Sequence, residues 1–282
     1  MSDQLRELVQ EYRGGKLSRR GFVARALGVA AMALLAACAA RSGDGATGGD
    51  RMAASNVEFT GKGGRLAGYL ARPAAGQNPA VVIIHANQGL NDYTRDVARR
   101  LAREGYVALA VDFLSRHGGT VAVNPKGEGL SNIRELAPWQ QVAEDSTAAF
   151  DYLKTQPFVR GDRLGLMGFC WGGEMTFSSA TEVRRLSAVV VFYGRSPQPL
   201  DRVKTIEAPL LAHYGEKDPG VNQDIPGTVT AMGKYNKPYS YKIYPGAQHG
   251  FHTDTSDRYH PEAAKEAWAW TLDFFKSNLR RA

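Results

Sequence analysis

Apolar residues along this chain gather in short β-branched runs, which alternate with longer segments of helical periodicity. The run Ala80–His85 is apolar up to its last residue, which is typical of a strand covered on both faces of a sheet. Asp92–Glu104 repeats its apolar positions at helical spacing, and Gly105 follows as a helix stop. This alternation predicts an α/β fold with a largely parallel sheet.

The same patterns predict the other elements of the folded region. A hairpin comes first, with strands at Asn56–Thr60 and Arg65–Arg72 around a Gly-rich turn. Further strands are expected at Tyr106–Asp112, Arg163–Phe169, Ser187–Tyr193, Pro209–Tyr214 and Tyr239–Tyr244, and further helices at Gln140–Leu153, Gly173–Thr181 and Pro261–Leu279. Ser115–Ala137 is polar and lacks clear periodicity, so we expect it to form an excursion over the domain.

Composition narrows the class of protein. The chain has 282 residues, of which 43% are hydrophobic and 22% charged, as in ordinary soluble globular proteins. This excludes a mostly disordered chain, a collagen-like repeat and a polytopic membrane protein. The formal charge of +7 comprises +3 from residues 1–37 and +4 from residues 38–282. Because the basic residues of the second part are scattered, no nucleic-acid partner is expected.

The first 37 residues resemble an export signal. Arg19 and Arg20 stand two residues before Phe22 and ahead of the uncharged stretch Ala26–Ala37. That stretch is too short for the ~20 residues that span a bilayer. Paired arginines in this position resemble a twin-arginine signal. We therefore expect residues 1–37 to direct export, to the periplasm or cell envelope.

Three interpretations of the end of this segment stay open. Leu35–Cys38 resembles a lipobox, in which Cys38 would carry a lipid that attaches the protein to a membrane. Ala37–Ala39 is also readable as a cleavage site that leaves no lipid. Alternatively, Asp3–Tyr12 is an uncleaved amphipathic segment packed on the fold. Residues 38–55 are expected to form a flexible tether before a single domain at 56–282.

The candidate chemistry begins with one of only two cysteines in the chain. Gly168–Gly173 (GFCWGG) lies between a predicted strand and a predicted helix. It matches the nucleophile-elbow pattern, with Cys170 in place of serine. Because such a turn brings backbone segments close together, glycine is needed at 168 and 172. The alternative is a small buried cysteine in a glycine-rich turn.

Two further residues occur in the order that this elbow requires. Asp218 follows the predicted strand at 209–214, and His249 follows the one at 239–244. The order nucleophile, acid, histidine is that of hydrolases built on an α/β sheet. Since ligand sites in open α/β sheets collect at the carboxyl ends of strands, we expect the three side chains to meet there. Taken singly, Asp218 could form a turn and His249 could lie in a solvent loop.

These motifs, with VVIIHANQGLN, GEKD and GAQHGF, resemble the dienelactone hydrolase family over 56–279. The resemblance implies an α/β-hydrolase fold with helices on both faces of the sheet. It implies Cys170 as nucleophile, His249 as general base and Asp218 as its orienting carboxylate. The backbone N–H groups of Asn87 and Trp171 would form the oxyanion hole. The expected reaction is hydrolysis of a small ester or lactone through a thioester, without a metal or other cofactor.

The chain departs from the family pattern at two places. Ala86 and Gln88 stand where a Glu and an Arg are common, and no Arg follows Phe251 at the position where dienelactone-specific members hold a substrate carboxylate. A thioesterase or broad esterase is therefore one alternative, and a catalytically weak binding protein on the same scaffold is another. His85 and His252 lie near the expected site and could contact substrate, but packing is the simpler role for both. Metal-ligand spacing is absent among the histidines other than His249, which are His85, His117, His213, His252 and His260.

Overall fold

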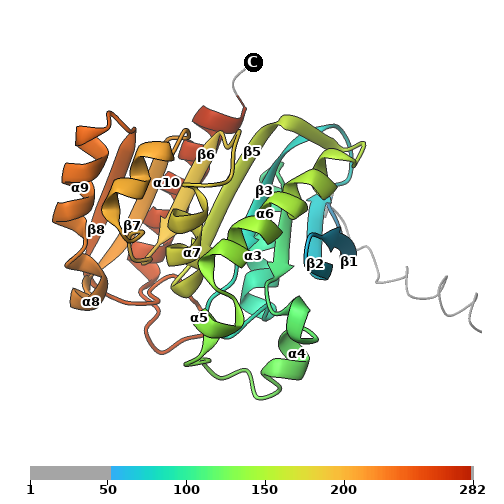
Figure 1. The fold of residues 1–282 in the computed structure, drawn as a ribbon, viewed down its shortest axis with the longest axis horizontal. Helices are drawn as coiled ribbons and strands as arrows, with labels where there is room; N and C mark the ends of the chain where they lie inside the picture. Colours follow the sequence, from blue (N-terminus) through green and yellow to red (C-terminus); the bar gives the residue numbers. More distant parts are fainter. Residues whose placement is uncertain (1–51, 281–282) are drawn as a thin grey trace, which may run out of the picture. The chain divides into compact units, whose positions relative to one another are not determined.

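A central eight-stranded sheet organises the computed structural model, which describes residues 52–280 (Figure 1). The expected export signal, Cys38 and most of the expected tether lie outside the described residues. The strand order is β1-β2-β4-β3-β5-β6-β7-β8. The pairs β1/β2 and β2/β4 are antiparallel and the remaining pairs are parallel, which confirms the predicted fold class. No helix within 52–280 is long and apolar enough to cross a membrane.

The bounds of the elements follow the chain in order. The strands are β1 (Met52–Gly61), β2 (Gly64–Pro73), β3 (Asn78–Ile84), β4 (Val107–Asp112), β5 (Val159–Phe169), β6 (Ala188–Phe192), β7 (Leu210–Lys217) and β8 (Tyr239–Gln248). The α-helices are α3 (Asp92–Arg103), α4 (Thr120–Val123), α5 (Ile133–Leu136), α6 (Trp139–Lys154), α7 (Trp171–Ser179), α8 (Pro219–Asn222), α9 (Ile225–Lys234) and α10 (Pro261–Leu279). Short 3-10 helices lie at Ser115–His117 and Leu200–Thr205.

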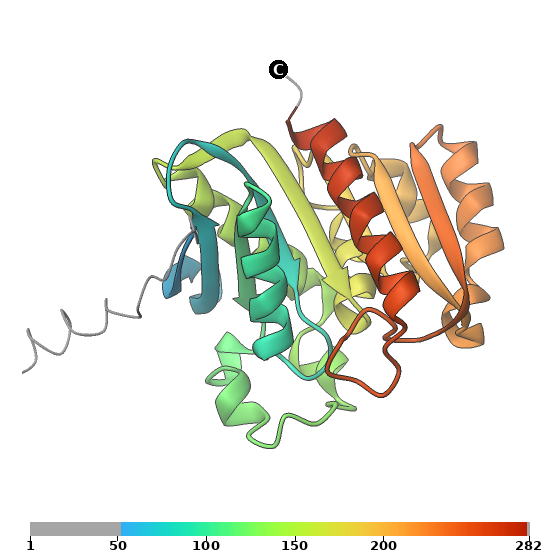
Figure 2. The same cartoon turned by 180° about the vertical axis from the view of Figure 1, so that it is seen from behind.

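Both faces of the sheet are covered, because its central strands contain runs of consecutive buried apolar residues, such as residues 80–84 of β3 and 107–111 of β4. In β3, Val82 and Ile84 pack into the core beneath α6 and α7, while Val81 and Ile83 pack into the core beneath α3 and α10. Figure 1 shows α6, α7 and α9 in front of the sheet, and Figure 2 shows α3 and α10 on the opposite face. This arrangement leaves the carboxyl edge of the parallel strands for the loops.

Three element boundaries differ from the expectation by four residues each. β1 begins at Met52 rather than Asn56, because residues 52–55 pair with β2, so the expected tether is four residues too long. β5 begins at Val159 rather than Arg163, since a bulge opposite Pro79/Ala80 lets its first residues pair with β3. β8 continues to Gln248 and so reaches the residue before His249.

Helix α9 is not predicted by the local sequence. Its residues IPGTVTAMGK include a proline, two glycines and β-branched side chains, which disfavour an isolated helix. In the fold, proline stands in the first turn, where it has no hydrogen bond to lose. Ile225, Thr228, Ala231 and Met232 are buried at helical spacing. Tertiary packing therefore overrides propensity here.

Candidate active site

Cys170 stands at the sharp turn between β5 and α7. Its backbone has φ 58° and ψ −121°, a left-handed conformation that costs a non-glycine residue ~1–3 kcal/mol. Two hydrogen bonds hold it there: the Cys170 N–H donates to the Phe192 carbonyl, and the Cys170 carbonyl accepts from the Glu174 N–H, both at 3.0 Å. The side chain is partly exposed at the helix N-terminus. The surrounding backbone thus holds the thiol at the edge of the sheet.

The expected need for glycine at 168 and 172 is confirmed. A Cβ on Gly172 would lie 2.2 Å from the His85 carbonyl oxygen and 2.4 Å from that of Ile84. A Cβ on Gly168 would lie 2.3 Å from the Gly172 carbonyl oxygen. These contacts are with backbone atoms, which cannot relieve a clash by rotating away as a flexible side chain can. The elbow therefore packs against the end of β3 with no room for a methyl group.

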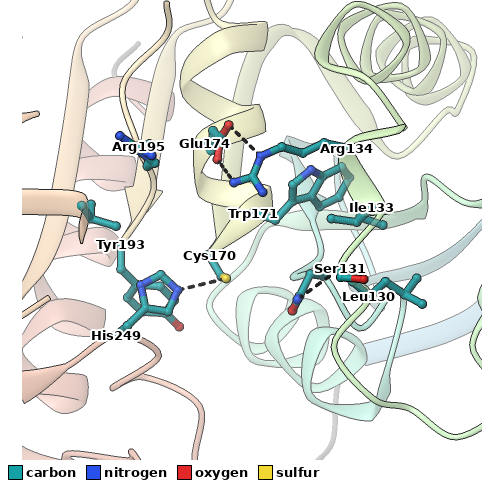
Figure 3. A pocket seen from close by; sticks show the side chains of 12 residues that line it. Leu130, Ser131, Ile133, Arg134, Cys170, Trp171, Glu174, Tyr193, Arg195 and His249 are labelled. Carbon is teal, nitrogen blue, oxygen red and sulfur yellow. Dashed lines mark hydrogen bonds and ion pairs between the residues drawn. The ribbon is translucent and has the colours of Figure 1, made fainter. Parts of the chain in front are cut away.

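The fold brings His249 and Asp218 to the same edge as Cys170. His249 Nε2 lies 3.0 Å from the Cys170 Sγ (Figure 3), and its Nδ1 lies 2.5 Å from Oδ2 of the buried Asp218. The three residues follow β5, β7 and β8, whose parallel direction puts all their carboxyl ends at one edge. The Tyr193 ring packs edge-on against the imidazole, with centroids 5.1 Å apart. The imidazole is therefore held from several sides.

The charge state of His249 follows from these contacts. Burial by itself lowers the pKa of His249, but hydrogen bonds and charges from Asp218 and Cys170 more than offset it. The pKa of His249 consequently lies well above its usual value of 6.5. An imidazole so placed between a carboxylate and a sulfur favours its protonated form.

Asn87 and Trp171, the two residues expected to supply an oxyanion hole, both line the cavity in front of Cys170. Asn87 follows β3, and Trp171 is the first residue of α7. Within residues 52–280, neither backbone N–H donates to an acceptor. Two free N–H groups beside a sulfur can bind a developing negative charge on oxygen.

The cavity has a volume of about 250 Å³ and is walled by several segments that are far apart in the sequence. Its lining residues are Asn87, Leu130, Ser131, Ile133, Arg134, Cys170, Trp171, Glu174, Tyr193, Arg195, Val221 and His249. Ala86, His85 and His252 do not line it.

Three charged residues of the cavity were not identified from the sequence. Arg134 forms a two-pronged ion pair with Glu174, at 2.5 and 3.2 Å, and Figure 3 shows this pair above Cys170. Arg195, on the same side, pairs with Asp224 at 3.2 Å. Glu174 lies one helical turn after Cys170 and could have been found by that spacing. Nothing in the sequence indicates that Arg134 and Arg195 approach it.

The excursion, Ser115–Ala137, supplies one wall of the cavity and is fastened to the loop after β3. The Leu130 N–H donates to the Asn87 carbonyl at 3.1 Å, and the Asn124 side chain donates to the Gln88 carbonyl at 2.9 Å. The Leu90 N–H donates to the Thr120 hydroxyl at 2.8 Å. These hydrogen bonds tie a segment without regular periodicity to the loop that carries the Asn87 N–H.

Two histidines near the site are structural. His252 is buried and bonds to the Tyr93 hydroxyl at 2.6 Å, and His213 lies between the hydroxyls of Tyr244 and Thr271. Burial lowers the pKa of both imidazoles to about 3, so both are neutral. Within residues 52–280, no group of three or more His, Cys, Asp or Glu side chains could hold a metal ion.

The strand order and the strained cysteine elbow define a hydrolase of the α/β-hydrolase class. The model of the dienelactone hydrolase family matches residues 66–279, and the chain belongs to this family. It is accordingly a hydrolase of lactones or esters.

Relatives and solved structures agree with this assignment. A Saccharolobus solfataricus protein with the provisional name carboxymethylenebutenolidase is 34% identical over 80% of this chain and 97% of its own. A Bradyrhizobium protein, provisionally named 2-oxo-3-(5-oxofuran-2-ylidene)propanoate lactonase, is 39% identical over 76% of this chain and 90% of its own. The crystal structure of a provisionally assigned dienelactone hydrolase from Klebsiella pneumoniae superposes with a TM-score of 0.73 at 28% identity, covering 79% of this chain and 98% of that one.

Proposed function

We propose that the protein hydrolyses carboxylic esters or lactones with Cys170 as nucleophile, His249 as general base and Asp218 as the carboxylate that orients the imidazole. One observation carries this proposal: Nε2 of His249 lies 3.0 Å from Sγ of Cys170 while its Nδ1 contacts a buried carboxylate. The thiolate, not the thiol, is the nucleophile, and an imidazole at this distance can take the thiol proton.

Acylation is the first half of the reaction. The Cys170 thiolate attacks the carbonyl carbon, and the π electrons move to the carbonyl oxygen, which the N–H groups of Asn87 and Trp171 stabilise. When the tetrahedral intermediate collapses, the bond to the alkoxide oxygen breaks and that oxygen takes a proton from the His249 imidazolium. The products of this half are an alcohol and a thioester on Cys170. In a lactone both remain in one molecule.

Deacylation reverses the roles. His249 takes a proton from water as the water oxygen attacks the thioester carbonyl, and the same two N–H groups receive the oxyanion. Collapse breaks the carbon–sulfur bond and releases the carboxylic acid. The Cys170 thiolate leaves beside the imidazolium, which restores the starting ion pair.

The cavity favours a small substrate that carries a negative charge. A volume of about 250 Å³ suits a compact ester or lactone. Arg134, Glu174 and Arg195 line it, so two guanidinium groups face one carboxylate among the lining residues, although Arg195 also pairs with Asp224 outside the lining. A carboxylate on the substrate would meet planar N–H donors that suit it in charge and geometry. These arginines are not at the position after Phe251 that the family resemblance indicates.

The test is hydrolysis by the full chain and by Cys170→Ala of p-nitrophenyl esters, simple lactones, a dienelactone and an acyl thioester. We expect turnover of at least one ester or lactone, its loss in Cys170→Ala, and inhibition by one equivalent of thiol reagent at Cys170. Preferential turnover of the thioester would support the thioesterase alternative. Absence of turnover on the whole panel, with ligand affinity kept in Cys170→Ala, would support the binding-protein alternative.

We also propose that residues 1–37 export the protein through the twin-arginine route to the cell envelope. The paired arginines before an uncharged stretch support this, and Leu35–Cys38 supports a lipid anchor. Arg19→Lys combined with Arg20→Lys should retain the protein in the cytoplasm, as fractionation would show. Cys38→Ser should release it from the membrane fraction only if Cys38 is lipidated.

A further inference from the structure

His85 is fully buried at the end of β3, directly before the loop that carries the Asn87 N–H, and both of its ring nitrogens are engaged. Nε2 lies 3.2 Å from the backbone nitrogen of Phe113, and Nδ1 lies 2.7 Å from the carbonyl oxygen of Ala86. The side chain does not line the cavity and so does not contact substrate there.

The partners of this ring determine its tautomer. A backbone N–H can only donate, so Nε2 of His85 must be the unprotonated nitrogen that accepts from Phe113. The single ring proton then lies on Nδ1 and is donated to the Ala86 carbonyl. Burial lowers the pKa of His85 by more than the nearby Asp112 carboxylate raises it, in agreement with a neutral ring.

The Ala86 carbonyl belongs to the same peptide unit as the Asn87 N–H. Because a peptide unit is planar and trans, the direction of its C=O sets the opposite direction of its N–H. The Ala86 oxygen accepts from His85 Nδ1 on one side and from the Gly89 N–H at 3.1 Å on the other. Rotation of this peptide would break both hydrogen bonds.

The same ring also contacts the residue that bears the second free N–H. The His85 and Trp171 rings stack with centroids 5.4 Å apart and planes 26° from parallel. The Phe113 ring packs edge-on at 5.7 Å and closes another side of the imidazole. One buried side chain thus contacts the peptide unit that carries the Asn87 N–H and the residue that carries the Trp171 N–H.

We propose that His85 is a positioning residue, which holds the Ala86–Asn87 peptide so that the Asn87 N–H points to the developing oxyanion. The inference rests on the proposed acyl transfer. It adds to that proposal the reason why the orientation of the Asn87 N–H is fixed although this N–H has no acceptor of its own. A donor that is correctly oriented before the reaction pays no reorganisation cost as charge develops.

Two variants separate the Nδ1 donor from the rest of the side chain. Asn places an amide N–H near the position of Nδ1, whereas Leu has no donor, and both lose the acceptor for the Phe113 N–H. His85→Leu should lower kcat for ester hydrolysis by about 10- to 100-fold with KM nearly unchanged, because a misplaced donor is lost mainly in the transition state. His85→Asn should recover most of this loss.

The rate at which iodoacetamide alkylates Cys170, measured on the Cys170 peptide, distinguishes a positioning role from a merely structural one. Loss of a merely structural side chain would change this rate as well as kcat. Alkylation displaces iodide without forming an oxyanion, so its rate should be the same in wild type and both variants. Equal kcat in His85→Leu and His85→Asn would overturn the proposal. So would an equal fall of kcat and alkylation rate, which would mean that the whole site is disturbed. Absence of ester turnover in the wild type would instead refute the proposed function on which the inference rests.

A measurement on the unaltered protein covers the case in which His85→Leu does not fold. Nitrogen-15 NMR of the labelled chain should show His85 with a protonated Nδ1 and an unprotonated Nε2 across neutral pH. A proton on Nε2 would overturn the proposal, since Nδ1 could not then donate to the Ala86 carbonyl.

Discussion

The cysteine elbow and the excursion both line the same cavity, but different interactions hold each of them in place. At the elbow, Gly168 and Gly172 leave no room for a methyl group between the turn and neighbouring backbone, including the end of β3, and Cys170 has a positive φ. The excursion has only short helices and is held by hydrogen bonds of Thr120 to Asp112 and by hydrogen bonds to residues 30 or more positions away. The reacting thiol therefore rests on a turn fixed by close backbone packing against β3, and the wall that meets the substrate rests mainly on hydrogen bonds to the loop after β3.

The largest expected effect comes from the reacting side of the cavity. Asp218→Asn should lower kcat by roughly 10²- to 10⁴-fold, because the amide no longer holds the charged imidazole, as in triads based on serine. The pKa of His249 should also fall towards 6.5, since the carboxylate that raises it is lost. Kinetics and an NMR titration of His249 would measure both changes.

The sign of the accompanying stability change follows from the raised pKa. In the folded wild type, stabilisation of protonated His249 is fully present below the unfolded-state pKa near 6.5 and is lost as pH rises through the folded-state value. The stability difference between wild type and Asp218→Asn should therefore be largest in acid and shrink towards alkaline pH. Asp257→Asn, which alters an exposed carboxylate in the loop after His249, is the matched control. An unchanged His249 titration in Asp218→Asn would contradict the orienting role.

The rigidity of the elbow can be tested by adding a single methyl group. Gly172→Ala should destabilise the fold by about 3 kcal/mol or more, because its Cβ meets two backbone oxygens that cannot move separately from β3. Gly233→Ala is the control, since a Cβ on this glycine of α9 has no atom within 4 Å. It should be stabilising by up to ~1 kcal/mol. Urea unfolding would compare the two, and equal stabilities would refute the close-packed elbow.

The smallest effect is expected at the excursion. Arg134→Ala should raise KM for a carboxylate-bearing ester by about 5- to 20-fold. The reason is that the substrate loses one charge-assisted hydrogen bond, which contributes ~1–2 kcal/mol at a half-exposed position. KM for a neutral ester and the rate of Cys170 alkylation should not change. Lys126→Ala, in the exposed part of the same segment, serves as the control. Parallel rises of KM for both esters would mean that Arg134 supports the wall and does not recognise charge.

The candidate reacting residues were predictable because each carries a local signature. The glycines around Cys170 indicate a turn that few sequences can form. Asp218 and His249 each follow a predicted strand, in the order that the α/β-hydrolase pattern requires. The strands themselves were predictable because both faces of the sheet are covered, which leaves uninterrupted apolar runs. Helix α9 was missed because its propensity is poor and its formation depends on packing.

The sequence by itself thus determined the fold class, the family resemblance and the residues proposed to react, because each depends on a pattern within a few neighbouring positions. Only the tertiary structure decided that Arg134 and Arg195 line the cavity, that the excursion forms one of its walls, and that His85 Nδ1 lies 2.7 Å from the Ala86 carbonyl oxygen. Those facts depend on contacts between segments far apart along the chain. The chain folds these segments together through the twist and order of the sheet, which no local pattern records.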